Sequence, residues 1–200
     1  MKKIKWTVPL LFSLGSILFL TACGQSGSAG VESVTLRSES AELDKAALLE
    51  ECKAKSLYVP GEKIKGLLSL KNRFEPAVLM EQKVVNDHAT GLMWQQDEDA
   101  TRFTWKEAGA YVAKMNAEKF AGYDNWRMPT AVELASLLSP AKKGDYFIDP
   151  VFHKELLSTW SVDQVKDMML SAWFIDFSEG RPFDGNRAAG LGHVRLVRVK

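Results

Sequence analysis

Cysteine and histidine are scarce in this chain of 200 residues, and their scarcity excludes several kinds of chemistry. The chain has two cysteines, Cys23 and Cys52, and three histidines, His88, His153 and His193. The histidines lack the spacing of metal ligands, so they predict no metal site. The G-x-S-x-G motif of one class of serine nucleophiles is also missing. We therefore expect no enzyme activity and no cofactor.

An excess of charge of one sign is also missing. The 26 basic and 25 acidic residues give a formal net charge of +1, and the export signal described below contains three of the lysines. Its removal leaves 23 basic residues against 25 acidic ones. Nucleic-acid binding needs a basic surface that neutralises phosphates, so this balance predicts no nucleic-acid partner. Any anionic ligand would need a local cluster of cations.

The first 22 residues have the pattern of an export signal. Three lysines in MKKIK precede an apolar run over residues 8–20, and small residues then lead directly into Cys23. A basic start, a short apolar run and small residues before a cut are typical of a secretory signal. The run is too short and too interrupted for a transmembrane helix, which needs about 20 apolar residues.

The segment that ends at Cys23 resembles the lipobox of bacterial lipoproteins, whose cysteine is acylated and becomes the new N-terminus. The resemblance implies a signal peptide over residues 1–22, lipid such as palmitate on Cys23, and a membrane as a partner. Each buried methylene of an acyl chain contributes about 0.8 kcal/mol, so several chains anchor a protein firmly. Gly24, in place of Asp, favours the outer membrane of a Gram-negative cell, with the domain facing the periplasm or the cell surface.

The next part of the chain has weak structural signals. Residues 23–40 start rich in serine and glycine, and we predict a flexible tether there. Residues 41–81 form an N-terminal helical or irregular extension, with a helix over 41–55 capped by Ser40 and a turn at Pro60-Gly61. Residues 64–80 fit neither the helical nor the strand period. Cys52 either joins two chains or is a buried helical cysteine, which is more common.

Residues 82–200 carry sharper signals. VVNDHATGLMW predicts two strands around a turn. The capping boxes TWKE at 104–107 and TAVE at 130–133 predict two helices, the first ending near Lys119 and the second before Pro140. Residues 172–177 predict a central strand covered on both faces, and residues 178–192 a long loop. The final HVRLVRVK predicts a strand that has a bulge or is covered on both faces.

Five segments in order, TGLMWQQ, TWKEAGAYVAKMN, AGYDNWRMPTAVELASLL, AWFIDFSEG and HVRLVRV, resemble the Lcl C-terminal domain family. This bacterial domain is first named from a collagen-like adhesin, and the resemblance covers residues 82–200. DNWRMPTAVEL is its most specific part. The resemblance implies an α+β, C-type-lectin-like fold: two helices packed on small antiparallel sheets with a long irregular loop. The final strand has leucine and valine within R-L-V-R where relatives often have R-C-V-R, so a bridge used by some relatives is absent.

The same motif also resembles a stretch of the sulfatase-modifying factors, which oxidise a client cysteine with their own cysteine pair. Only Cys52 is free here, and it lies outside the matching region, so an enzyme of this kind is the weaker alternative. A structural role explains the motif as well. Trp126 fills the angle between strand and helix, Thr130 caps the helix, and Arg127 reaches a carboxylate such as Asp124 or strand-end carbonyls.

The lectin-like resemblance implies a membrane-anchored binding or adhesion module, with glycans as a ligand class. The founding adhesin's domain is associated with sulfated glycans. We assign ligand binding to five residues of the predicted 178–192 loop, whose groups bond hydroxyls or anions and stack on sugars. They are Arg181, Phe183, Asp184, Asn186 and Arg187. An ordinary solvated loop is the competing interpretation.

Two further hypotheses remain open at this stage. The chain could be a non-enzymatic structural or protein-docking component of the envelope, which binds a partner through the helix over 41–55. Asp97-Glu98-Asp99 could bind calcium, as some lectin-like domains do. An acidic turn of this kind is more often only solvated, so we predict no metal site.

Overall fold

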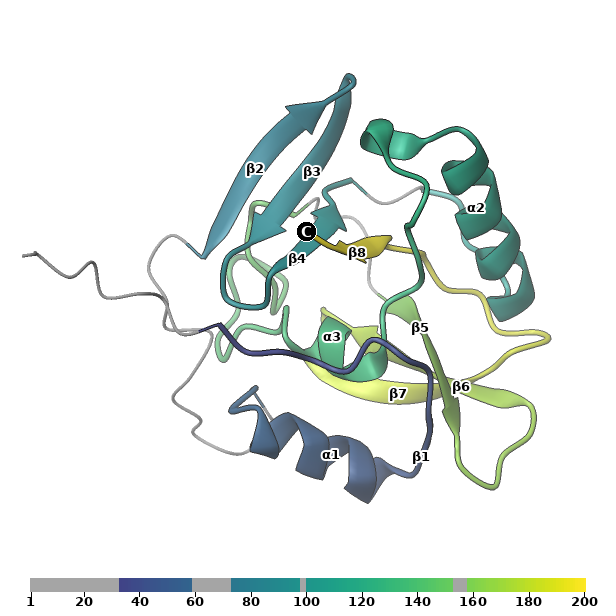
Figure 1. Ribbon diagram of the computed structural model, residues 1–200. Coiled ribbons are helices and arrows are strands. Elements are labelled where there is room, and N and C mark those ends of the chain that lie inside the picture. Colours follow the sequence, from purple (N-terminus) through teal and green to yellow (C-terminus); the bar gives the residue numbers. More distant parts are fainter. Residues whose placement is uncertain (1–32, 59–72, 98–99, 153–157) are drawn as a thin grey trace, which may run out of the picture. The chain divides into compact units, whose positions relative to one another are not determined.

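Figure 1 shows the computed structural model of the chain, which describes residues 33–58, 73–97, 100–152 and 158–200. The signal peptide, Cys23, the start of the tether and the Pro60-Gly61 turn lie outside these residues. The strands are β1 (Glu42–Leu43), β2 (Phe74–Leu79), β3 (Gln82–Asp87), β4 (Leu92–Gln95), β5 (Ser158–Val165), β6 (Ser171–Asp176), β7 (Arg181–Asn186) and β8 (Val197–Val199). The helices are α1 (Lys45–Ala54), α2 (Trp105–Ala117), the 3-10 turn η2 (Phe120–Gly122) and α3 (Ala131–Ala135).

The strands form two four-stranded sheets, ordered β1-β5-β6-β7 and β2-β3-β4-β8. Only β1 and β5 pair in parallel; every other pairing of the named strands is antiparallel. The α+β class predicted from the sequence is confirmed. The predicted hairpin is β3 and β4, which close with Asp87 opposite Leu92. Its turn contains Gly91 with a φ of +70°, a conformation that glycine adopts without strain.

The sheets separate two hydrophobic cores. In β6, Trp173 and Ile175 lie in one core, and Ala172 and Phe174 lie in the other. Successive side chains of a strand point to opposite faces, so a strand between two cores must be apolar on both. The central strand predicted at residues 172–177 is therefore confirmed, with β5 on one side of it and β7 on the other.

Each core is closed by different helices. Leu48 and Cys52 of α1 and Leu134 of α3 belong to the first core. Tyr111 of α2 and Phe120 of η2 belong to the second. Burial raises the pKa of the Cys52 thiol to about 12, so this cysteine is a poor nucleophile at neutral pH. Of the two interpretations offered for Cys52, the structure shows the buried helical cysteine.

The C-terminal segment connects the two sheets. His193 forms a parallel bridge with Thr159 of β5, and Val197 pairs with Trp94 of β4. All residues from 192 to 197 are buried, so cover on both faces, rather than a bulge, explains the shifted apolar pattern. Arg195 lies inside this segment and donates to the carbonyls of Gln95 and Gln96 at 2.8 and 2.7 Å.

The prediction of a long loop over residues 178–192 is wrong. Residues 181–186 form β7, which pairs with β6 along its whole length. Pro182 is tolerated because β7 lies at the sheet edge, where one side of the strand needs no amide donor. Gly185 is required by packing, since a Cβ there would lie 2.3 Å from Cε1 of Phe174 and 2.9 Å from Cη2 of Trp160.

The helix boundaries also differ from the prediction in places. Helix α1 is capped by Asp44, whose carboxylate accepts from the Ala47 amide at 2.8 Å, and not by Ser40. Both capping boxes are present at the predicted threonines, and α2 ends at Ala117, close to the predicted Lys119. Helix α3 is shorter than expected and ends at Ala135. Of the undecided stretch over residues 64–80, the part from Phe74 to Leu79 is a strand.

Residues 33–40, which the sequence assigned to the tether, pack against the domain. Leu36 is buried in the first core. The Arg37 guanidinium pairs with Asp163 of β5 at 2.8 Å and with Glu51 of α1 at 3.0 Å. Burial alone would lower the pKa of Arg37, but its hydrogen bonds to Asp163 and Glu51 raise that pKa above its ordinary value. The composition of this segment gave no sign of that pairing.

We predict that Asp163→Asn destabilises the protein strongly. Asp163 is fully buried and accepts from Arg37 and from the amides of Ala41 and Ala131. An asparagine places an NH₂ group against these donors. Loss of one partner of a buried pair costs about 3–5 kcal/mol, and partial exposure of Arg37 favours the lower end. Urea unfolding measures the loss; the exposed Asp145→Asn is the control, and equal midpoints for the two variants would contradict the prediction.

Candidate functional site

Four of the five predicted ligand-binding residues lie on β7, and the fifth follows it. Side chains alternate along a strand, so Arg181 and Phe183 share one face, and Asp184 and Asn186 share the other. Arg187 lies beyond the strand end. Six residues of extended chain span about 20 Å, so Arg181 and Arg187 do not act on one small ligand group.

Arg181 and Phe183 form part of an aromatic surface with Phe174 of β6. The Arg181 guanidinium carbon lies 3.8 Å from the centroid of the Phe183 ring. The Phe183 and Phe174 rings are stacked, with centroids 5.7 Å apart and planes at 30°. We call Phe174, Phe183 and Arg181 the β6–β7 aromatic face. It presents ring faces next to a cation that is nearly half exposed, with 46% of its side-chain area accessible.

A hollow of about 390 Å³ lies against this face. Its lining residues come from segments far apart in the sequence: Arg102, Ser158, Phe174, Asp176, Phe183, Leu191 and His193. The Arg102 guanidinium donates to the Leu191 carbonyl at 2.6 Å. One oxygen of Asp176 accepts from Ser178 and from the Glu179 amide, which fixes the β6–β7 turn. Apart from Phe183, none of these residues was predicted as a site residue from the sequence, because no local pattern links them.

Asn186 and Arg187 have structural partners instead. The Asn186 side-chain oxygen accepts from the amides of Ala188 and Ala189 at 2.9 and 3.2 Å, so it orders the turn after β7. Arg187 donates to the Gln164 side chain at 2.9 Å and to the Met169 carbonyl. Its guanidinium also lies 5.1 Å from a Trp105 ring centroid. The geometry therefore separates these two residues, and Asp184 on the opposite face, from the β6–β7 aromatic face.

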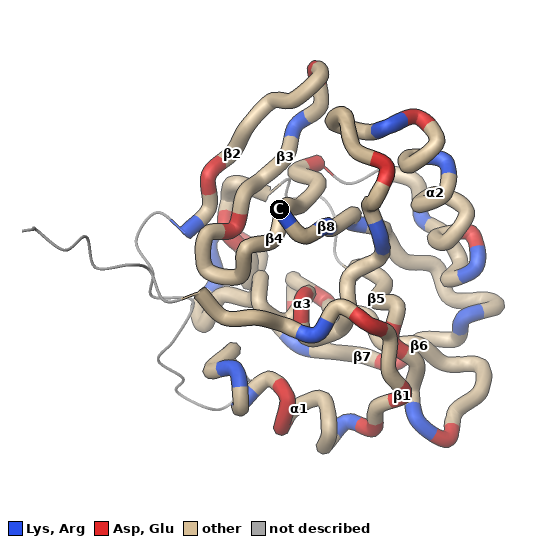
Figure 2. Tube along the Cα trace, viewed as in Figure 1, with Lys and Arg blue, Asp and Glu red and all other residues tan. Residues whose placement is uncertain are grey.

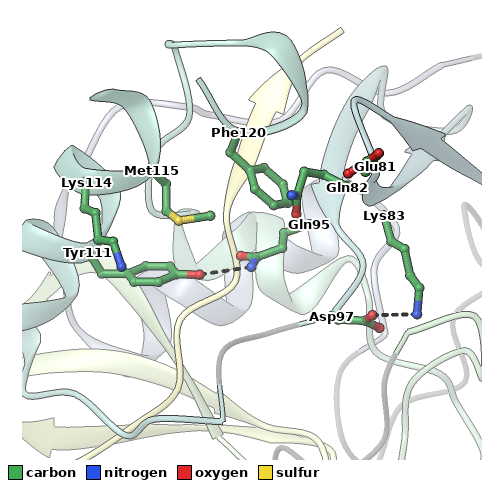
Figure 3. Close-up of a pocket in the computed structure, with 9 residues that line it drawn as sticks. All are labelled: Glu81, Gln82, Lys83, Gln95, Asp97, Tyr111, Lys114, Met115 and Phe120. Carbon is green, nitrogen blue, oxygen red and sulfur yellow. Dashed lines mark hydrogen bonds and ion pairs between the residues drawn. The ribbon is translucent and has the colours of Figure 1, made fainter. Parts of the chain in front are cut away.

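A second hollow, of about 340 Å³, lies between α2, η2 and the β2–β3 turn (Figure 3). Its lining residues are Glu81, Gln82, Lys83, Gln95, Asp97, Tyr111, Lys114, Met115 and Phe120. The Gln95 amide donates to the Tyr111 hydroxyl oxygen at 3.0 Å, and Lys83 pairs with Asp97 at 3.0 Å. This hollow combines buried aromatic groups with four charged side chains. No sequence motif pointed to it.

The DNWRMPT motif is used for packing. Trp126 is 2% exposed, and its indole N–H donates to the Phe120 carbonyl at 2.8 Å. Arg127 forms a bidentate ion pair with Glu133, at 2.7 and 2.6 Å, and does not pair with the predicted Asp124. Glu133 is also the carboxylate of the capping box, where it accepts from the Thr130 amide. The structural interpretation of the motif agrees with these contacts.

Charges are mixed over the described elements. Both α1 and α2 carry basic and acidic residues, and Figure 2 shows the two signs close together along the trace. Asp97 pairs with Lys83, and residues 98 and 99 lie outside the described part of the chain. In that described part, no group of three or more His, Cys, Asp or Glu side chains could hold a metal ion. The four described segments also contain no helix long and apolar enough to cross a bilayer.

The fold and the motif together define an α+β domain whose DNWRMPT motif packs in its core. The profile of the Lcl C-terminal domain family matches residues 83–198, more than half of the chain. The chain belongs to this family, which suggests an adhesin-like C-terminal domain. A comparison with curated proteins finds no match.

We predict that Trp126→Ala destabilises the protein by about 3–5 kcal/mol, as truncation of a large buried aromatic residue does. The variant loses the contacts with Phe120 and Tyr123, whose rings meet the indole edge to face. Chemical unfolding followed by circular dichroism gives the value. The half-buried Trp105→Ala is the matched control and should lose less. An unchanged midpoint for Trp126→Ala would make that residue a candidate for stacking on a ligand.

Proposed function

We propose that the chain is an envelope lipoprotein whose Lcl C-terminal domain is a C-type-lectin-like binding module for glycans, with the β6–β7 aromatic face as its site. The observation that carries the proposal is the stacked Phe174–Phe183 pair beside Arg181, at the edge of a hollow. Aromatic faces pack on the apolar side of a sugar ring, and the polar groups around them fix its orientation.

The groups around the aromatic face favour an anionic glycan. Arg102 and Arg181 are both exposed cations near its rings, and guanidinium groups bind carboxylates and sulfates in a bidentate manner. Arg181 also pairs with the exposed Glu179 at 2.7 Å, so an anionic ligand must compete with that surface ion pair. Asp176 and Ser158 line the same hollow and can bond sugar hydroxyls. The predicted mature chain has a slight acidic excess, so attraction of an anion depends on this local pair of arginines.

The C-type-lectin-like assignment is supported by the order of the elements. Two capped helices, α2 and α3, precede the strands β5 to β8, and the last strand pairs with β4 of the early hairpin. The long irregular loop expected for this fold does not occur at residues 178–192, where the β6–β7 hairpin lies. The proposed site therefore uses a hairpin face instead of a loop.

The membrane anchor rests on the sequence before residue 33. The basic start, the apolar run and Cys23 support lipidation, and Gly24 supports the outer membrane. Residues 24–32 would then separate the lipid from the packed part of the chain. An extended chain reaches about 3.3–3.6 Å per residue, so this segment spans up to roughly 30 Å. That reach lets the domain stand off the bilayer and meet ligands.

A second function, docking to an envelope protein, is supported by a different surface. Met168, Met169 and Leu170 follow one another in the β5–β6 turn, with exposed fractions of 48%, 86% and 61%. Arg187 is bonded to this turn in two places: its amide donates to the Leu170 carbonyl and its guanidinium donates to the Met169 carbonyl. Contiguous exposed apolar side chains mark interaction sites. We propose this turn as the docking surface in place of the helix over 41–55, because Leu48 and Cys52 of that helix are buried in the core.

We expect Arg181→Ala and Phe183→Ala each to weaken capture of a sulfated polysaccharide by about tenfold or more. The reason is the loss of a charge-assisted hydrogen bond, worth about 1.5–3 kcal/mol, or of a stacking surface. Arg187→Ala should not change capture, because Arg187 lies beyond the end of β7 and does not line the hollow, and Lys45→Ala on α1 is the charge-matched control. Pull-downs on sulfated and neutral polysaccharides measure capture, and thermal melts verify folding. Capture of no polysaccharide by the wild type would reject the glycan site and leave the docking function.

We expect Cys23→Ala to abolish acylation and to move the protein out of the detergent phase. The lipid is joined to the cysteine sulfur through a thioether bond, and alanine has no atom that can form this bond. Metabolic labelling with a palmitate analogue, followed by detergent phase separation, tests this. Cys52→Ala is the matched control and should keep its label. Label that persists on Cys23→Ala would place the anchor elsewhere.

A further inference from the structure

We propose that the hollow against the β6–β7 aromatic face selects acidic sugars that keep two adjacent hydroxyls free, and that Asp176 is the residue that determines this choice. The inference rests on the glycan-binding function proposed above and names the ligand class of the same site. That class is acidic polysaccharides with unsulfated diols, as opposed to densely sulfated ones. Asp176 and Ser158 both line the hollow.

A polar row of side chains crosses the sheet at this hollow. Asp176 of β6 lies directly opposite Ser158 of β5 on one side and Arg181 of β7 on the other. These three strands lie side by side in Figure 1. Side chains that are directly opposite each other in an antiparallel pair have Cβ atoms about 4.5–5.5 Å apart. A hydroxyl, a carboxylate and a guanidinium group therefore start from neighbouring positions on one face of the sheet.

An aromatic row runs beside the polar row. Phe174 lies opposite Trp160 and Phe183, and it shares a face with Asp176 because side chains two apart on a strand point the same way. Trp160 is fully buried and meets Phe174 edge to face, with ring centroids 5.1 Å apart. Its indole N–H donates to the Phe103 carbonyl at 2.8 Å. These contacts hold the aromatic row in place, so a sugar ring that packs on it directs the hydroxyls at its edge toward the polar row.

Asp176 has one carboxylate oxygen left for a ligand. Its Oδ1 accepts from the Ser178 amide and hydroxyl at 2.7 and 2.6 Å and from the Glu179 amide at 3.0 Å. Among the residues that the structure describes, its Oδ2 has no hydrogen-bond partner and the carboxylate has no ion pair. Arg181 lies opposite but pairs with Glu179 at 2.7 Å instead. The negative charge of Asp176 is therefore not neutralised by a neighbouring cation.

This carboxylate favours hydroxyls and disfavours sulfate esters. An ionised carboxylate only accepts hydrogen bonds, and a sugar hydroxyl can donate one to Oδ2 while its neighbour bonds the Ser158 hydroxyl. A sulfate ester has no proton to donate, and the like charge of Asp176 repels it. Arg102, an exposed cation in the same lining, can bind the anionic group of the ligand. The hollow thus accepts a negative charge at Arg102 and rejects one at Asp176.

Two polymers with one backbone test this selection: chondroitin sulfate, whose uronic acid keeps a free diol, and fully O-sulfated chondroitin, which has more charge and no free hydroxyl. Attraction by charge alone would make the fully sulfated polymer the tighter ligand. We expect the wild type to bind chondroitin sulfate more tightly by about tenfold or more, the effect of one hydrogen bond to a charged group. Isothermal titration of the detergent-purified full chain measures both affinities.

Asp176→Asn should reverse this order, because the amide nitrogen replaces Oδ2 with a donor and the negative charge is lost. The remaining oxygen still accepts from Ser178 and Glu179, so the melting temperature should stay close to that of the wild type. Asp184→Asn is the matched control. It makes the same charge change at an exposed residue on the other face of β7, outside the hollow, and should keep the wild-type order.

A third polymer separates the hydroxyls from the charge. Periodate cleavage followed by borohydride reduction breaks the diol of chondroitin sulfate and leaves every charge in place, and this product should lose most of its affinity for the wild type. Three results would each overturn the selection: tighter wild-type binding of the fully sulfated polymer, an unchanged order in Asp176→Asn, or full affinity for the cleaved polymer. All three leave the glycan site itself intact. If the wild type binds none of the polymers, the glycan site is rejected and this inference with it.

Discussion

The Asp163 carboxylate accepts four hydrogen bonds in the interior of the domain, and four parts of the chain meet there. Arg37 brings in the N-terminal segment, and through its second partner Glu51 it also brings in α1. The Ala131 amide places the start of α3 against β5. A buried carboxylate destabilises the fold by several kcal/mol unless hydrogen bonds satisfy its oxygens. The N-terminal segment, α1 and α3 must therefore all be in place around Asp163 for the fold to be stable. The Thr130 hydroxyl, which donates to the Arg37 carbonyl at 3.0 Å, adds a neutral link at the same point.

This constraint explains why the segment before the family domain is part of its core. The family profile begins at residue 83, but Leu36, Leu48 and Cys52 complete the core that faces α3 and β6. Without α1, the apolar side chains of α3 would lie open on one side. The second core has no such need, because α2 and η2 close it from within the family domain. The first core therefore needs residues that precede the family domain, whereas the helices that close the second core lie within the family domain.

Sequence patterns succeeded where the structural signal is local. A capping box is complete within four residues, and the β3–β4 hairpin has its turn chemistry between its strands, so both were predictable. The failures are long-range. Nothing near Arg37 indicates a partner at Asp163, and Pro182 and Gly185 suggested a loop because their tolerance depends on an edge position and on the rings of Phe174 and Trp160. For the candidate site, Phe183 and Arg181 were predicted as ligand-binding residues, although within a loop and not on a strand, and Arg102, Ser158 and His193 meet them only through the fold.

The residues that identify the family differ from those proposed to bind ligands, and the contacts explain why. Trp126, Arg127 and Glu133 have all their strong interactions inside the domain, so a change in any of them costs stability first. The aromatic face uses exposed groups such as Arg181, whose replacement changes stability by only about 0.5 kcal/mol or less. Ligand preference can therefore change while the core signature stays fixed. It follows that membership of the family predicts the scaffold of this protein, whereas its ligands must be determined at the exposed residues around the β6–β7 aromatic face.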